Sequence, residues 1–298
     1  MVVRFVEIML KYTLERDTVI HMKYTKLMSM TLLALMLTAC GKEESKTPAS
    51  APAQEEVDEK IENEETNEEL VADVVEEEPM EEVTTKPLYK LNEANWAFKP
   101  IADAPSKVVL LTIDDAPDKR SLEMAKTLKE LNAPAIFFVN GHFLDTEEEK
   151  AVLKEIHAMG FAIGNHTQTH ANLKDLTEEQ QRAEIMQVSE TVEAIIGEKP
   201  KYFRAPFGSN TDFSKALVKE QGMLLMNWTY GYDWESQYQD ATALTDIMVN
   251  SEFLTNGANL LMHDRVWTAA ALKGIVEGLR GKGYEMIDPA TIQGVTAE

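Results

Sequence analysis

The feature that most constrains the fold is an alternation of apolar runs with amphipathic segments, which continues from residue 107 to residue 287. We expect seven short strands, at 107–113, 134–139, 161–165, 201–204, 223–228, 258–262 and 284–287. Between them, apolar residues recur with helical spacing at 120–131, 146–158, 177–196, 211–221, 241–253 and 266–281. This β/α alternation predicts a parallel sheet covered by helices. Seven strands in series favour a barrel over a doubly wound sheet, although periodicity alone does not decide between the two.

The N-terminal 40 residues predict a targeting segment. From Met22 onward, Lys23 and Lys26 form a positively charged start, and an apolar stretch follows at 27–37. The small residues before Cys40 complete the pattern of a secretory signal peptide. We therefore expect translation to start at Met22 and residues 1–40 to comprise upstream sequence and a signal peptide.

Cys40 is the only cysteine of the chain, which excludes an internal disulfide and a zinc-thiolate cluster. The sequence Leu37-Thr38-Ala39-Cys40-Gly41 resembles a bacterial lipobox. That resemblance implies that Cys40 becomes the lipidated first residue of an extracytoplasmic lipoprotein and anchors it to the membrane with two acyl chains. The alternative is an ordinary signal peptide with a chance cysteine.

Residues 41–86 predict a disordered acidic linker, since 42–85 hold seventeen acidic residues against three lysines and few large apolar ones. Fully extended, this linker reaches on the order of 150 Å.

The folded domain is expected at 87–298, where 91–106 form a leading arm packed on the sheet. The net charge is −22 for the chain and −10 over 86–298, which argues against a nucleic-acid partner. We expect a monomer.

Polar clusters follow the expected strands, where parallel α/β folds collect their functional residues. Four of the six histidines lie at these points. In strand order the clusters are Asp114-Asp115, Asn140 to Phe143, Asn165 to His170, Arg204 to Gly208, Tyr230 to Trp234, and Leu261 to Asp264.

Three of these residues suit a metal. His166 and His170 are spaced i and i+4, which on one helical turn places both imidazoles on one face. Together with an aspartate from a neighbouring strand end they would form a His₂Asp set suited to catalytic Zn²⁺. The other aspartate could then act as a general base and His263 as a general acid. A surface histidine pair and an Asp-rich turn are the simpler alternatives.

The motifs TIDD, HTQTH, RAPFG, DW and LLMHD, in this order, resemble the five motifs of the NodB-homology polysaccharide deacetylases, carbohydrate esterase family 4. The resemblance spans nearly all of 107–290. It implies a distorted (β/α) barrel and a metal-dependent removal of acetyl groups from N-acetylated sugars. Zn²⁺ is the metal we expect, with Co²⁺ or Ni²⁺ as alternatives.

The resemblance also implies residue roles. Asp114 resembles the catalytic base and His263 the general acid, while Asp115, His166 and His170 resemble the metal ligands. The remaining positions match as follows: Arg204, which orients the base; Asp233, the partner of that arginine; the backbone N–H of Phe207, an oxyanion donor; Trp234, a pocket wall; Leu261, a contact of the acetyl methyl group; and Asp264, a supporting partner of the site.

Several of these positions also have simpler readings. Arg204 and Asp233 could form only an ion pair between loops, Trp234 could be core, His263 could be a satisfied core histidine, and Asp264 could cap the helix that follows it.

The sequence departs from the family pattern at three places, one of which is Phe207 in place of a commoner tyrosine. Ala116 stands where the family prefers glycine, which would strain the backbone if that position needs a positive φ. The stretch 228–234 is about one residue short and lacks an acidic residue often present there.

We therefore expect a deacetylase that acts on a cell-envelope glycan, such as GlcNAc or MurNAc of peptidoglycan. The alternative is a lipoprotein that binds glycan with little or no catalysis and stabilises the cell wall. A different amide hydrolase on the same fold is a third reading.

Overall fold

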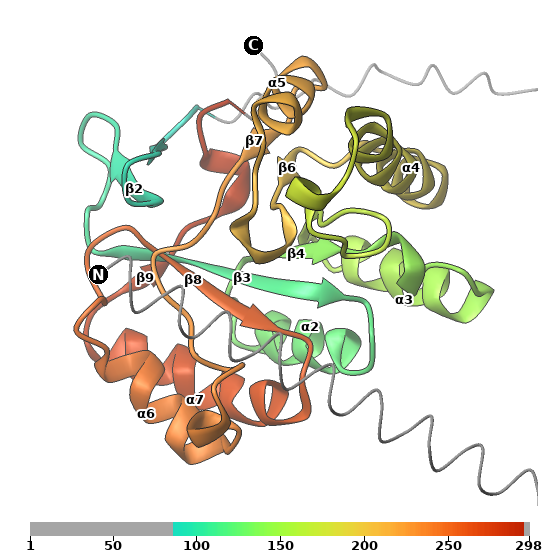
Figure 1. The fold of residues 1–298 in the computed structure, drawn as a ribbon. Helices are drawn as coiled ribbons and strands as arrows, with labels where there is room; N and C mark the ends of the chain where they lie inside the picture. Colours follow the sequence, from blue (N-terminus) through green and yellow to red (C-terminus); the bar gives the residue numbers. More distant parts are fainter. Residues whose placement is uncertain (1–85, 295–298) are drawn as a thin grey trace, which may run out of the picture. The chain divides into compact units, whose positions relative to one another are not determined.

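The computed structural model describes residues 86–294, and Figure 1 shows how their elements are arranged. The predicted signal peptide, Cys40 and residues 41–85 of the predicted linker lie outside the described residues. Within the described part, none of the helices combines the length and the apolar character needed to cross a membrane.

Seven parallel strands form one curled sheet, in the order β7-β6-β5-β4-β3-β8, with β9 paired to the start of β3. All seven expected strands are present, although β6, β7 and β9 are only two residues long. Their bounds are β3 Val108–Ala116, β4 Ala135–Val139, β5 Ala162–Asn165, β6 Tyr202–Phe203, β7 Leu224–Leu225, β8 Ala258–His263 and β9 Glu285–Met286.

The two ends of the sheet are joined by an irregular segment that follows β7. The N–H of Thr229 donates to the carbonyl of Asn259 (2.8 Å), and the N–H of Leu261 donates to the carbonyl of Tyr230 (2.9 Å). This seam along β8 curls the sheet into a half-barrel. The prediction of a distorted (β/α) barrel is confirmed.

Six α-helices cover the sheet, each within three residues of its expected range. They are α2 Ser121–Glu130, α3 Glu147–Ala158, α4 Glu178–Ile196, α5 Asp212–Glu220, α6 Ala241–Asn250 and α7 Val266–Gly281. Threonines begin three of them: the side chains of Thr146, Thr177 and Thr211 each accept the N–H three residues on, in a capping box. Helix α7 packs against both α6 and α2, and α3 packs between α2 and α4 (Figure 1).

The leading arm contains a hairpin that the sequence did not predict. Strands β1 (Tyr89–Asn92) and β2 (Ala97–Pro100) pair antiparallel. The N–H of Phe98 donates to the carbonyl of Gly257, just before β8 (2.7 Å). The arm therefore packs on the sheet as expected and covers the end where β3 and β8 begin.

Strand β3 is buried on both faces, as its unbroken apolar run predicts. Val109, Leu111 and Ile113 join the core beneath the helices. Val108 and Leu110 join a second cluster inside the curl. Because side chains alternate along a strand, Thr112 and Asp114 continue the inner row and point into the half-barrel.

Candidate active site

The paired aspartates both reach the inside of the half-barrel because β3 contains a bulge. Between Ile113 and Ala116 the strand has one residue more than its partner β4, and Asp115 has a φ of 62°. A regular strand would send Asp115 to the outer face, whereas a bulge can re-aim a side chain. The strand continues through Ala116, three residues beyond its expected end.

The backbone strain that the sequence suggested at Ala116 is not there. The left-handed conformation belongs to Asp115, and Ala116 is a fully buried residue of β3. Asp tolerates this region better than most side chains because its short polar group can bond locally. Alanine in place of glycine therefore leaves the backbone of this pair intact.

Asp115, His166 and His170 form one compact set of metal-binding side chains. One ligand atom from each lies within 4.8 Å of the others. Asp115 Oδ1 is 3.8 Å from His166 Nε2 and 3.5 Å from His170 Nε2. His166 Nδ1 bonds the carbonyl of Arg204 (2.6 Å), which fixes the imidazole so that Nε2 faces the aspartate.

The two histidines meet through a loop, and the expected helical turn is wrong. Residues 166–170 are not helical, and both Thr167 (φ 71°) and His170 (φ 59°) have left-handed backbone conformations. Glu184 of α4 braces this loop from outside, since its carboxylate accepts the N–H (2.8 Å) and the hydroxyl (2.6 Å) of Thr169. The loop brings the two imidazole centroids to 4.9 Å.

Arg204 holds Asp114 from within the half-barrel. Its side chain is fully buried, and Nη1 donates to Asp114 Oδ1 and to Thr112 Oγ1, both at 2.7 Å. The guanidinium lies over the ring of Phe138, 4.4 Å from its centroid. Asp114 Oδ2 faces His166 Nε2 at 3.6 Å. One carboxylate oxygen is thus fixed by the arginine while the other faces the metal-binding set.

Asp233 does not pair with Arg204, so the expected ion pair between these two residues is wrong. Its Oδ1 lies 2.7 Å from His263 Nδ1, and its Oδ2 accepts the N–H of His263 (2.6 Å) and the hydroxyl of Thr268 (2.8 Å). The reason is topological: the segment carrying Asp233 follows the seam along β8 and meets the end of that strand. Asp233 therefore orients the imidazole of His263.

Three further predicted residues lie around this centre. The ring of Trp234 stands perpendicular to His263 at 5.6 Å, which fits a pocket wall. The ring of Phe207 lies 4.9 Å from that of His170 and is 39% exposed, and its backbone has a φ of 59°. Leu261 is buried on β8, two residues before His263 and on the same face of the strand.

Asp264 does not cap the helix that follows it, and its carboxylate serves the start of α2. It accepts the backbone N–H groups of Lys119 (3.0 Å), Arg120 (2.6 Å) and Ser121 (2.8 Å) and the hydroxyl of Ser121 (2.7 Å). Helix α7 begins at Val266, and its N-cap residue Arg265 makes no side-chain capping hydrogen bond. Asp264 thus ties the end of β8 to the loop after β3.

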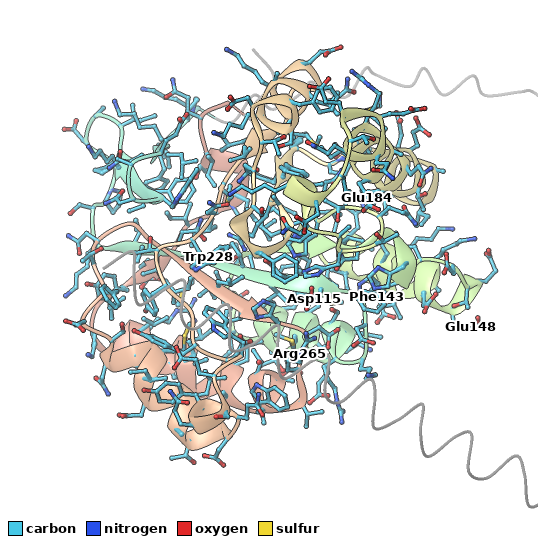
Figure 2. The ribbon with its side chains drawn as sticks, viewed as in Figure 1. Asp115, Phe143, Glu148, Glu184, Trp228 and Arg265 are labelled. Atoms are coloured by element: carbon cyan, nitrogen blue, oxygen red, sulfur yellow. The ribbon has the colours of Figure 1, made fainter. Side chains whose placement is uncertain are left out.

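The sequence analysis missed two residues of the site. Asn259 faces inward from β8 and accepts from Arg204 (3.3 Å). Arg265 donates from Nη2 to Asp115 Oδ2 at 2.6 Å. Figure 2 labels both Asp115 and Arg265, which lie close together in that view. Arg265 directly follows a His-Asp pair at a strand end of an acidic domain. This position is the signal that could have identified it.

The charges of the site set the protonation of its groups. Burial lowers the pKa of His263, but the carboxylate of Asp233 outweighs burial and raises that pKa to about 9. Burial, reinforced by His166, lowers the pKa of His170 to about 4. Burial raises the pKa of Asp115, yet the charges of His263, His166, His170 and Arg265 together hold it well below its ordinary value. At neutral pH, Asp115 is thus ionised, His170 neutral and His263 protonated.

This donor set fits a divalent metal. A neutral imidazole and a carboxylate are the forms that bind Zn²⁺, and two nitrogens with one oxygen leave a position for water or substrate. Asp115, His166 and His170 can therefore hold a metal ion.

Comparison with known proteins places this site in a family. The sequence model of the family described as polysaccharide deacetylase matches residues 102–253. A peptidoglycan-N-acetylglucosamine deacetylase of Bacillus cereus is 32% identical over 188 residues, covering 60% of this chain and 68% of that protein. The peptidoglycan-N-acetylmuramic acid deacetylase PdaC of Bacillus subtilis is 26% identical over 227 residues, covering 74% of this chain and 44% of that protein.

Solved structures agree with this placement. A family 4 carbohydrate esterase from Streptomyces lividans, in complex with acetate, has a TM-score of 0.55 at 25% identity and covers 60% of this chain and 91% of its own. A CE4 family pseudoenzyme from Bacillus anthracis has the same TM-score at 28% identity and covers 61% of this chain and 63% of its own. The match to the family's sequence model extends over just more than half of the chain. The chain therefore belongs to the polysaccharide deacetylase family, carbohydrate esterase family 4.

Proposed function

We propose that this chain is a Zn²⁺-dependent N-deacetylase, anchored outside the cytoplasm by a lipid at Cys40, that acts on GlcNAc or MurNAc of peptidoglycan. One observation supports the catalytic part of this proposal. Asp114 and His263, each bonded to an oppositely charged partner, lie in the same site as the three metal-binding side chains. Arg204 Nη1 donates to Asp114 Oδ1 and fixes that carboxylate, and the pairing with Asp233 raises the pKa of His263 to about 9, so His263 is protonated at neutral pH. The glycan-active relatives and the lipobox resemblance support the substrate and the location.

The reaction adds water to the acetyl carbonyl and breaks the C–N bond, releasing acetate and a free amine. Asp114 takes a proton from the attacking water at Oδ2, the oxygen that Arg204 leaves free. His263 gives its proton to the leaving nitrogen from Nε2, because Nδ1 is bound to Asp233. Opposed acid and base roles of this kind are what amide hydrolysis requires. A metal held by Asp115, His166 and His170 supplies Lewis-acid polarisation of the carbonyl and a more acidic water.

The surrounding residues position the sugar. Trp234 and Leu261 bound the space beside His263, and we assign them contacts with the sugar and with the acetyl methyl group. The backbone N–H of Phe207 is our candidate donor to the developing oxyanion, because its ring contacts the metal ligand His170. A donor at this position stabilises charge that appears only as the reaction proceeds.

The test is acetate release from N-acetylglucosamine oligomers by the purified protein. Chelators should abolish release, and Zn²⁺ should restore it. Asp114→Asn should lower turnover by about 10²-fold or more, as loss of general-base catalysis does, while metal content stays intact. His263→Gln is the companion variant, since Asp114→Asn leaves a buried arginine unpaired and could weaken the fold. Full activity in a folded Asp114→Asn protein would remove Asp114 as the base.

A glycan-binding protein without catalysis is the competing function, and the likeness to a pseudoenzyme structure keeps it in view. The same protein preparation separates the two. Retention on insoluble peptidoglycan at full metal occupancy, with no acetate released from any N-acetylated oligomer, would favour the binding protein.

A further inference from the structure

The two oxygens of Asp115 have different partners. Oδ1 faces the Nε2 atoms of His166 (3.8 Å) and His170 (3.5 Å). Oδ2 accepts from Arg265 Nη2 at 2.6 Å. The side chain of Asp115 is 12% exposed and that of Arg265 is 35% exposed, so this ion pair is partly shielded from water and is screened less than one at the surface.

Arg265 is itself fixed in place. Its Nη1 donates to the carbonyl of Asp264 (2.8 Å), and the Asp264 side chain is locked to the start of α2. The guanidinium therefore spans a rigid strand end and the outer oxygen of Asp115. Its planar fork can hold two acceptors at once, which an ammonium group does less well.

We propose that Arg265 is a positioning residue of the metal site: it holds Asp115 Oδ2 so that Oδ1 alone is presented to the cation. This inference rests on the metal-binding part of the proposed function. It assigns a role to a residue outside the five sequence motifs. The outcome is a preorganised set of one oxygen and two nitrogens, in place of a carboxylate free to rotate or to bind with both oxygens.

Charge repulsion between Arg265 and the cation acts against this positioning effect. The direction of the change in metal affinity therefore distinguishes the two. Arg265 carries a positive charge near the cation and repels it. If repulsion dominated, removing the guanidinium would tighten metal binding. If positioning dominates, removing it weakens binding, because Asp115 must then be ordered when the metal binds.

The experiment measures Zn²⁺ affinity of the metal-stripped protein by competition with a chromophoric chelator. Arg265→Ala should bind Zn²⁺ about 10- to 100-fold more weakly, the usual cost of losing a residue that orients a ligand. Arg265→Lys keeps the charge and one donor and should fall between Arg265→Ala and the wild type. Arg120→Ala is the matched control, since Arg120 pairs with the surface residue Glu123 and should leave affinity unchanged.

The visible spectrum of the Co²⁺-loaded protein supplies a second readout. With Arg265 gone, Oδ2 can also reach the metal, so coordination number rises and the d–d bands weaken. Equal or tighter Zn²⁺ binding in Arg265→Ala, with an unchanged cobalt spectrum, overturns the proposal. Failure of the wild type to bind metal overturns it as well, whereas metal binding without acetate release overturns the deacetylase activity alone.

Discussion

Two buried ion pairs determine what the individual residues of this site can do. Arg204 with Asp114 and Asp233 with His263 each join a titrating group to an opposite charge that is itself shielded from water. The first pair fixes one oxygen of Asp114, and the second raises the pKa of His263 to about 9 and so keeps it protonated at neutral pH. Amide hydrolysis requires a proton acceptor and a proton donor in the same site.

The raised pKa of His263 predicts a pH dependence of stability in the metal-free protein. The imidazole ionises near pH 6.5 in the unfolded chain and near pH 9 in the folded one. Its pairing with Asp233 therefore contributes its full stabilisation below pH 6.5 and loses it as the pH rises through 9. Linkage puts the change at about 3 kcal/mol.

Urea unfolding of wild-type protein and His263→Gln at pH 6 and pH 10 checks this prediction. The difference in unfolding free energy between them should shrink by about 3 kcal/mol at the higher pH. His157→Gln, on the outer side of α3, is the control. A difference that stays constant across this range would contradict the assignment of the raised pKa to the Asp233 pair.

For individual residues, the sequence predicted which side chains lie in the site better than it predicted their bonding partners. The metal-binding residues and both titrating groups lie together as expected. The partner of Asp233 was wrong because it depends on how the segment after β7 meets β8, and short irregular segments leave no periodic signal. The bonding partners of Asp264 were not predicted for a similar reason, since the helix start that its carboxylate bonds lies 143 residues earlier in the chain.

Irregular backbone in one strand and one loop gives the site its geometry. A bulge in β3 turns Asp115 inward, and a loop with two left-handed residues brings His170 back toward His166. Strands and helices were predictable because their apolar periods repeat over many residues. The bulge and the loop were not, because they depend on positive φ at Asp, Thr and His, which sequence patterns associate with glycine.

Gly231, in the seam beside β8, has no room for a side chain. A Cβ added at Gly231 would collide with the carbonyl of Leu261 and press on the ring of Trp234. Gly231→Ala should therefore lower the free energy of unfolding by roughly 1–3 kcal/mol, the usual cost of overpacking. It should also reduce acetate release, because Trp234 stands against His263.

Thermal melting of the purified variants measures this cost. Gly281→Ala at the end of α7 is the matched control, since a Cβ there meets nothing within 4 Å. A helical Gly→Ala change is neutral or stabilises by up to about 1 kcal/mol. Equal melting temperatures for the two variants would show that the seam can open without cost.

At the scale of the whole molecule, the site and the leading arm lie at opposite ends of the sheet. The residues of the candidate site lie at the carboxyl ends of β3 and β8 and directly after β5, whereas the hairpin β1-β2 is bonded to Gly257, before β8 begins. The described chain therefore starts at the end of the sheet away from the candidate site.

The expected lipid anchor at Cys40 can be tested in the full-length chain. Cys40→Ser removes the thiol that a diacylglyceryl group needs, so the variant should move from the membrane fraction to the soluble fraction of the producing cells. Two acyl chains give stable attachment because each buried CH₂ contributes about 0.8 kcal/mol. The purified variant should release acetate from soluble oligomers at the wild-type rate, since residue 40 precedes the domain by more than 40 residues. Ser45→Ala, five residues away, should stay with the membrane. Membrane retention of Cys40→Ser would mean that something other than this cysteine holds the chain there.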